Sequence, residues 1–176
     1  MSGKQNGLIL LVIAILCLIV FNSRPGDAAP VRKAAVFDFE LIDTSLEGEK
    51  RGVDPAETAR LKTISDLLRD LLAKSGRYDI VPTAPAAEAI RDAGYIHSCN
   101  GCDASIAKEL GADIAITGHV QKISTLILNI TIVIRDAAAG THLRSVNADI
   151  RGNTDGSWAH GVRWLVRNRL LKDQGG

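Results

Sequence analysis

The sequence predicts a single α/β domain built on a mixed, twisted sheet of about five strands with helices packed on it. Strand and helix patterns alternate in the first half of the chain, which indicates a parallel βαβ unit with a right-handed crossover. Three alternating segments in the second half indicate an antiparallel meander, and an amphipathic segment closes the chain. The expected order is therefore β-α-β-α-α-β-β-β-α.

The first predicted strand covers 33–39, with Phe37 and Phe39 expected on one face because strand side chains repeat every second residue. The polar stretch 43–52 then reads as a surface loop with its own shape.

The next segment has a clear helix start. Asp54 is a capping residue, Pro55 suits the first helical position, and Glu57 completes a box-like arrangement at the third. Leucines and isoleucines mark one face until Gly76 ends the helix, and 78–81 forms a short second strand.

Two shorter helices precede the meander. Thr83 is expected to cap a helix over 84–93 that Gly94 stops, and Gly111 is expected to terminate a helix over 103–110.

Segments 114–123, 126–135 and 142–150 follow as strands, with a hairpin turn at 136–140. The last helix spans about 157–171. Its expected core face consists of Trp158, Val162, Leu165, Val166 and Leu170.

The N-terminus predicts export. Lys4 precedes a run without charged side chains from 8 to 21, and Gly26 and Ala28 stand at −3 and −1 of a cleavage point. The run is shorter than the roughly 20 residues of a membrane span. Leucine precedes Cys17 where a lipobox needs a small residue, so lipidation is not expected.

We therefore expect a signal peptide at 1–28 and one secreted α/β domain at 29–176, located in the periplasm or outside the cell. The alternative is a retained signal anchor, which would hold the protein at the inner membrane. Contact with a membrane is expected only through such an uncleaved segment.

Composition excludes several classes of function. The net charge of +1 argues against nucleic-acid binding, and the 4% aromatic content disfavours a base-stacking or carbohydrate groove. No sequence pattern for a hydrolase triad, metalloprotease, phosphate-binding loop or dinucleotide site is present. We expect no enzyme, no cofactor and no resident metal.

Cys99 and Cys102 are the sharpest local feature. Two intervening residues, Asn and Gly, suit a tight disulfide loop, and the disulfide is favoured outside the cytoplasm. A structural staple is one interpretation. A redox pair is another, because Cys102 lies near a helix N-terminus. Metal binding would need more ligands than His97 could add.

Two further groups are candidate contact sites. An acidic run could bind a cation or a partner, although a solvated loop has the same composition. It consists of Asp38, Glu40, Asp43, Glu47 and Glu49. Arg163, Trp164 and Arg167 on the last helix form a candidate partner face, with a solvated basic face as the alternative.

Two resemblances follow from short motifs. The segments 110–120 and 135–141 resemble envelope proteins: the N-terminal domain of the Tol–Pal propeller protein, the curli secretion lipoprotein family, and flagellar and penicillin-binding-protein-activator lipoproteins. The segments 35–49 and 151–158 are similar to a family of predicted secreted proteins of unknown function from methylotrophic and related proteobacteria. That family is associated with gene neighbourhoods of quinoprotein alcohol dehydrogenases and implies no catalytic residue.

The sequence thus favours a non-catalytic periplasmic accessory module that binds another envelope or secreted protein. The expected contacts are a sheet edge, the loop after the first strand and the last helix. Two alternatives remain: a thiol–disulfide helper of periplasmic quinoprotein alcohol oxidation, and a carrier of a small ligand or cation.

Overall fold

The computed structural model describes residues 30–172. The predicted signal peptide 1–28 lies outside the described residues. Within 30–172, no helix has both the length and the apolar character needed to cross a membrane.

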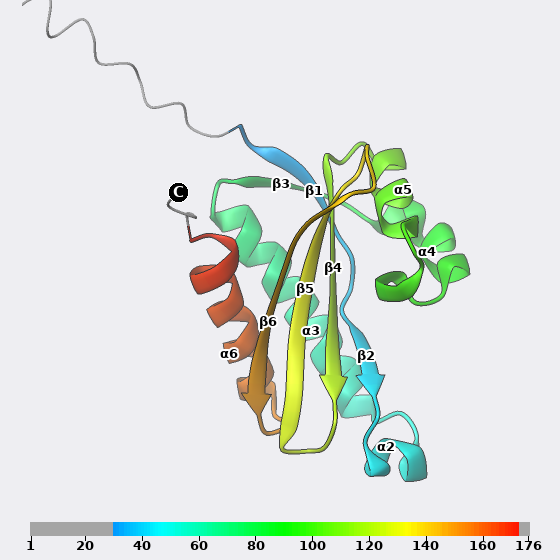
Figure 1. The fold of residues 1–176 in the computed structure, drawn as a ribbon, viewed down its shortest axis with the longest axis vertical. Helices are drawn as coiled ribbons and strands as arrows, with labels where there is room; N and C mark the ends of the chain where they lie inside the picture. Colours follow the sequence, from blue (N-terminus) through cyan, green and yellow to red (C-terminus); the bar gives the residue numbers. More distant parts are fainter. Residues whose placement is uncertain (1–29, 173–176) are drawn as a thin grey trace, which may run out of the picture. The chain divides into compact units, whose positions relative to one another are not determined.

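Secondary structure alternates along the described chain, as Figure 1 shows. The strands are β1 (Arg32–Val36), β2 (Glu40–Asp43), β3 (Tyr78–Val81), β4 (Ile114–Lys122), β5 (Ile127–Asp136) and β6 (His142–Arg151). The α-helices are α2 (Leu46–Arg51), α3 (Pro55–Lys74), α4 (Ala87–Ala93), α5 (Cys102–Glu109) and α6 (Asp155–Leu165). Short turns of helix are η1 (Ala84–Ala86), η2 (Ile96–Ser98) and the π-helical η3 (Val166–Leu170).

The six strands form one mixed sheet in the order β3-β1-β4-β5-β6, and β2 pairs with β4 beyond the end of β1. Strands β3, β1 and β4 are parallel, whereas β4, β5 and β6 form an antiparallel meander. The α/β fold class and the mixed sheet are confirmed. The additional strand is β2, which begins just after the predicted first strand 33–39, whereas β1 ends at Val36.

The interruption between β1 and β2 corrects the expectation that Phe37 and Phe39 share a face. Val36 is level with Ile116 and Glu40 with His119, so β1 and β2 together carry one residue more than β4. An extra residue breaks the two-residue period in the manner of a β-bulge. Phe37 and Phe39 therefore enter different hydrophobic clusters.

The predicted loop 43–52 is also corrected, because it contains helix α2. The Ser45 hydroxyl accepts a hydrogen bond from the Gly48 amide and caps the helix. Acidic residues occupy the first turn and basic residues the last, as the helix dipole favours. Polarity alone indicated a loop, whereas capping and charge order make this segment a helix.

The helix starts differ in how well they were predicted. Asp54 accepts a hydrogen bond from the Ala56 amide, as expected. Glu57, however, faces the interior instead of completing the cap. Thr83 makes no side-chain cap, because its backbone is already helical and a capping residue needs an extended one. The segment therefore begins as the 3-10 turn η1.

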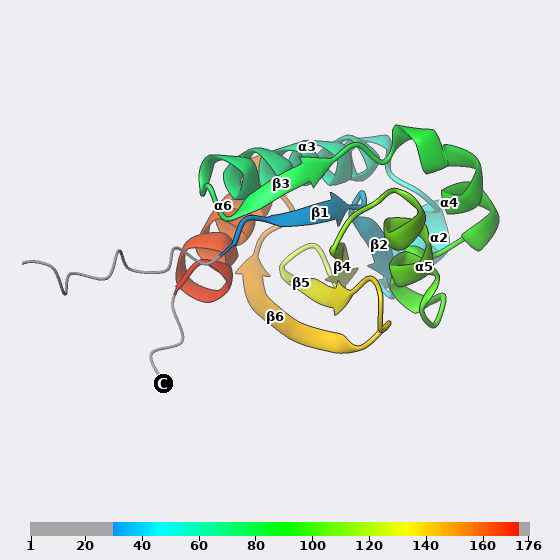
Figure 2. The same cartoon turned by 90° about the horizontal axis from the view of Figure 1, so that it is seen from above.

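Two hydrophobic clusters lie on opposite faces of the sheet. The larger joins the sheet to α3 and α6 and includes the entire predicted core face of the last helix. The smaller lies beneath α4, α5 and η2. In the view from above, α3 and α6 lie on one side of the curved sheet and α4 and α5 on the other (Figure 2). The outer part of β5 and β6 is not covered by α4 and α5 (Figure 1).

Gly118 on β4 provides a test of this packing. A methyl group at residue 118 would overlap the buried ring of Phe39. We expect Gly118→Ala to lower the free energy of unfolding by about 1–3 kcal/mol, the usual cost of overpacking. Urea denaturation measures the change. Gly156→Ala is the matched control, because a methyl group there meets no atom within 4 Å. Equal stability of the two variants would contradict this packing.

Candidate functional site

A buried lysine organises one end of the sheet. Lys122, the last residue of β4, is 2% exposed. Its Nζ lies 2.6 Å from Oε1 of Glu57 on α3 and 3.2 Å from Oδ2 of Asp43 on β2. Glu47 on α2 completes the ring, with its Oε2 at 3.4 Å. We call these four residues the Lys122 network. It ties β4, β2, α2 and α3 together.

The network continues to the point where the chain leaves β6 and enters α6. Asn153 donates a hydrogen bond to the same oxygen of Glu57 that binds Lys122. Arg60 on α3 binds Asn153 and, through its Nε, Oδ1 of Asp155 at 2.7 Å. The start of α6 is thereby fixed relative to the end of the sheet.

Burial and ion pairing shift the pKa values of Lys122 and Asp43 in opposite directions. Burial lowers the pKa of Lys122, but hydrogen bonds and charges from Glu57 and Asp43 outweigh it and raise that pKa overall. Burial raises the pKa of Asp43, but hydrogen bonds from Ser45 and the Lys122 ammonium lower it below its ordinary value. The lysine and Asp43 are therefore held in their charged forms.

The residue pattern contained a signal for this network. Lys122 has the same parity on β4 as the buried residues Ile114, Ile116 and Val120. Glu57 lies four residues before Leu61 on the apolar face of α3. A cation and an anion at two core positions of adjacent elements indicate a buried pair, and sequence reasoning missed it.

The predicted acidic run does not form one site, because its members lie in different surroundings. Asp38 pairs with Arg69, and Asp43 and Glu47 pair with Lys122. Glu40 accepts hydrogen bonds from the Ile96 and His97 amides, while Glu49 is exposed. Among residues 30–172, no group of three or more His, Cys, Asp or Glu side chains is arranged to hold a metal ion.

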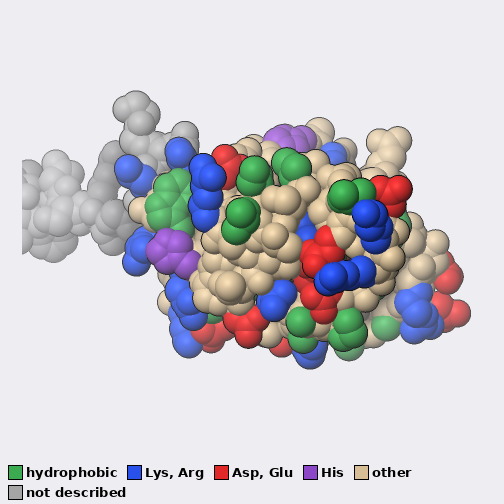
Figure 3. All heavy atoms as spheres, turned by 90° about the horizontal axis from the view of Figure 1, so that it is seen from below, with side chains coloured by type: hydrophobic (Ala, Val, Ile, Leu, Met, Phe, Trp, Pro, Cys, Tyr) green, Lys and Arg blue, Asp and Glu red, His purple; other side chains and the backbone are tan. Residues whose placement is uncertain are grey.

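Two members of the acidic run do border a groove. A cavity of about 700 Å³ lies between β2, α2, the start of α3 and Tyr95. Asp43 and Glu49 line it, and the exposed side chains of Val53 and Tyr95 stand at its rim. We call it the α2 groove. Seen from below, this end of the molecule mixes hydrophobic, acidic and basic side chains (Figure 3).

The predicted cysteine pair lies beside this region. Cys99 and Cys102 are joined as a disulfide, with Cα atoms 5.6 Å apart. The loop connects η2 to α5, and Cys102 is the first residue of α5. Just before it, His97 Nδ1 lies 2.6 Å from Oε2 of Glu40. The contacts with Glu40 hold η2 against β2, and the disulfide joins the end of η2 to the start of α5.

His97 also meets a second histidine. The ring of His119 on β4 lies 5.2 Å from the His97 ring, centroid to centroid. Burial lowers the pKa of His119, the neighbouring His97 ring lowers it further, and Glu40 offsets these effects only in part. His119 is therefore neutral at physiological pH.

A second groove follows the opposite edge of the sheet. One cavity, of about 590 Å³, is lined by residues 143–147 of β6 and by Arg169 of η3. Another, of about 400 Å³, is lined by residues 147–150 of β6 and by His160, Gly161 and Trp164 of α6. The two share Asn147, so together they run along β6. We call them the β6 groove.

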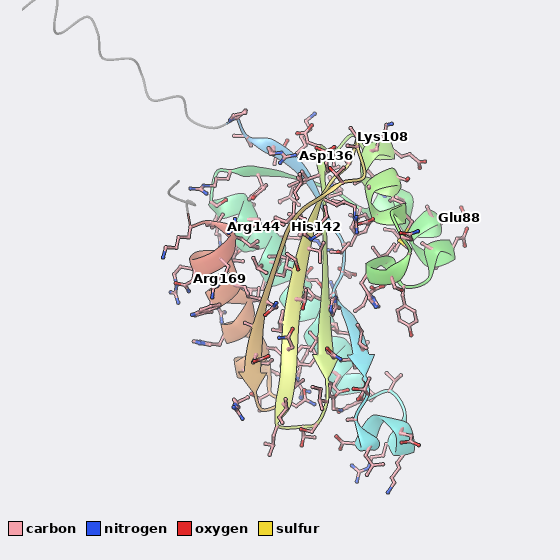
Figure 4. All side chains as sticks on the ribbon, viewed as in Figure 1. Glu88, Lys108, Asp136, His142, Arg144 and Arg169 are labelled. Atoms are coloured by element: carbon pink, nitrogen blue, oxygen red, sulfur yellow. A yellow bond between two sulfur atoms is a disulfide. The ribbon has the colours of Figure 1, made fainter. Side chains whose placement is uncertain are left out.

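Part of the candidate partner face on the last helix forms one side of the β6 groove. Trp164 lines it, and Arg169 lies over the Trp164 ring at 5.2 Å from the centroid. Arg163 and Arg167 are exposed on the same helical segment. Arg144 donates to the carbonyl oxygens of Arg169 and Leu170, which holds η3 beside β6. Figure 4 shows Arg144 and Arg169 on these two facing elements.

Comparisons with known proteins agree with the fold. A family model described as "Protein of unknown function (DUF2380)" matches residues 32–170. No curated protein matches the sequence. The LpoB C-terminal domain from Salmonella enterica matches with a TM-score of 0.51 and 14% identity, over 72% of this chain and 87% of that one. At that identity the likeness shows a shared fold alone.

Two other solved structures are more distant in shape. The LpoB C-terminal domain from Escherichia coli gives a TM-score of 0.49 at 13% identity, covering 76% of this chain and 92% of that one. Lipoprotein GNA1162 from Neisseria meningitidis gives 0.45 at 17% identity, covering 80% and 99%.

Removing the lysine tests the Lys122 network. Lys122→Met leaves the Glu57 carboxylate buried without its cation, and we expect a loss of about 3–5 kcal/mol in the free energy of unfolding. Urea denaturation at pH 7 measures it. The double variant Lys122→Met with Glu57→Gln should recover part of the loss, because the most deeply buried of the three carboxylates is then neutral. A single variant as stable as the wild type would show that the network contributes nothing.

Proposed function

We propose that this chain, which belongs to the DUF2380 family of proteins of unknown function, is a non-catalytic interaction module of the bacterial envelope. The observation that carries the proposal is the β6 groove, where an edge strand lies beside a basic helical wall. An edge strand presents backbone donors and acceptors that a partner can use. The predicted export signal supports the location.

The β6 groove is a better docking site than the α2 groove. In the α2 groove, Asp43 is already bound to Lys122, and helix α2 carries both acidic and basic groups. Along β6, the strand has a neighbour on one side only, within the described part of the chain. Backbone groups there supply affinity that does not depend on displacing an internal ion pair.

The other candidate residues have structural roles in this proposal. The Cys99–Cys102 disulfide and the Glu40–His97 contact position η2, and the Lys122 network positions the start of α6. The protein then acts as a scaffold for a docking surface and needs no cofactor.

Site-specific photo-crosslinking in intact cells tests the proposal. A photoreactive residue at Asn147 in the β6 groove should give one discrete adduct with another protein, which mass spectrometry identifies. The same residue at Lys62, exposed on α3, is the control and should give none. Purified partner should then bind the purified chain.

Two results would contradict the proposal in different ways. An adduct only from a third position, Val53, would move the docking site to the α2 groove. No adduct with another protein from any of these positions would remove the basis for an interaction module.

A further inference from the structure

The register of the sheet identifies which backbone groups of β6 face outward. The Gly152 amide donates to the Leu126 carbonyl, and this pair continues the β5–β6 register. Antiparallel pairs alternate between bonded and non-bonded positions. The even-numbered residues 144–150 therefore bond to β5. The N–H and C=O groups of Ser145, Asn147 and Asp149 point to the free edge.

The same alternation divides the side chains of β6 between two faces. Val146 and Ile150 are buried toward α6, and Arg144 reaches η3. Ser145, Asn147 and Asp149 lie on the other face and are exposed. A strand added to this edge would continue both faces. Every second side chain would lie beside the wall formed by α6 and η3, and the others would lie beside small polar groups.

That wall is basic. Arg144, Arg169 and His160 border the groove, and Arg163 and Arg167 extend the same surface. The acidic residue of this stretch of β6, Asp149, is on the opposite face and accepts a hydrogen bond from Asn129. The charge beside an added strand is therefore positive on one face, and acidic side chains complement it.

We propose that the β6 groove binds an extended acidic segment of a protein partner as an added strand, with an acidic residue at every second position facing α6 and η3. This inference rests on the proposed function and specifies the partner. Backbone hydrogen bonds supply the affinity, and Arg144 and Arg169 select the charge.

Defined peptides test the inference. The probe is a fluorescent ten-residue peptide of alternating Glu and Thr with blocked ends, and binding to the purified full chain is followed by anisotropy. It should bind, and more weakly at high salt because the exposed charges are screened. The matched peptide with Lys in place of Glu should not bind. Arg169→Gln should weaken binding roughly tenfold, as expected for loss of a charge-assisted contact.

The backbone contribution is tested separately. Two further peptides carry N-methyl groups on alternate residues, in opposite registers. Only the register that faces β6 should lose binding, because only its amides donate to the edge. Asn147→Pro removes one outward N–H and should weaken binding, whereas Asn147→Thr keeps it and should not. Thermal unfolding confirms that both variants fold.

Several results would overturn the inference. Equal binding of the Glu and Lys peptides would remove the charge argument, and equal binding of the two N-methylated peptides would remove strand addition. A crosslink at Asn147 to another protein without peptide binding would refute this inference and leave the proposed function standing. A crosslink to a second copy of the chain would show that the groove binds this protein itself and not an acidic segment of another protein.

Discussion

The buried ammonium group of Lys122 fixes the arrangement of the strands and helices that meet at one end of the sheet. Lys122 lies at a core position of β4, and its charge is balanced by carboxylates from β2, α2 and α3. Burying a charge costs free energy unless the charge is paired and hydrogen-bonded. The folded chain must therefore place each of these carboxylates beside Lys122. The network therefore specifies geometry more than it adds stability.

That geometry reaches the proposed docking surface through Glu57. Glu57 binds Asn153, which fixes the start of α6 just after β6 ends. Gly161 then lets α6 approach Ile150 and Ile130 closely, because a side chain there would overlap both. At the far end Arg144 holds η3. The width of the β6 groove is therefore set by contacts at both of its ends.

Local patterns predicted most elements because they depend on near neighbours. Asp54 marks a helix start through its side-chain cap, and Pro55 and Gly94 mark helix ends through their backbone geometry. The alternation of 126–135 follows one strand. The extra residue between β1 and β2 is defined only by pairing with β4, so the sequence does not predict it. Helix α2 was taken for a loop because its residues are mostly polar. The cysteine pair was foreseen as a disulfide.

The proposed docking surface could not be predicted from the sequence. It depends on which strand ends at the sheet edge, on the parity of the β5–β6 register and on the position of α6. The sequence singled out Arg163, Trp164 and Arg167 of the last helix. It did not indicate Arg144, because its contact with η3 exists only after folding. The strand period of β4 and the helix period of α3 place Lys122 and Glu57 at core positions, but the sequence analysis did not predict that they pair.

Amide hydrogen exchange on β6 tests whether the outward amides of this strand bind an added strand. In the free protein, the amides of Val146 and Ala148 should exchange slowly and those of Ser145, Asn147 and Asp149 quickly. Saturating Glu–Thr peptide should slow the second group specifically. Unchanged exchange at these three amides, or protection that appears only around α2, would show that the peptide does not pair with the edge of β6.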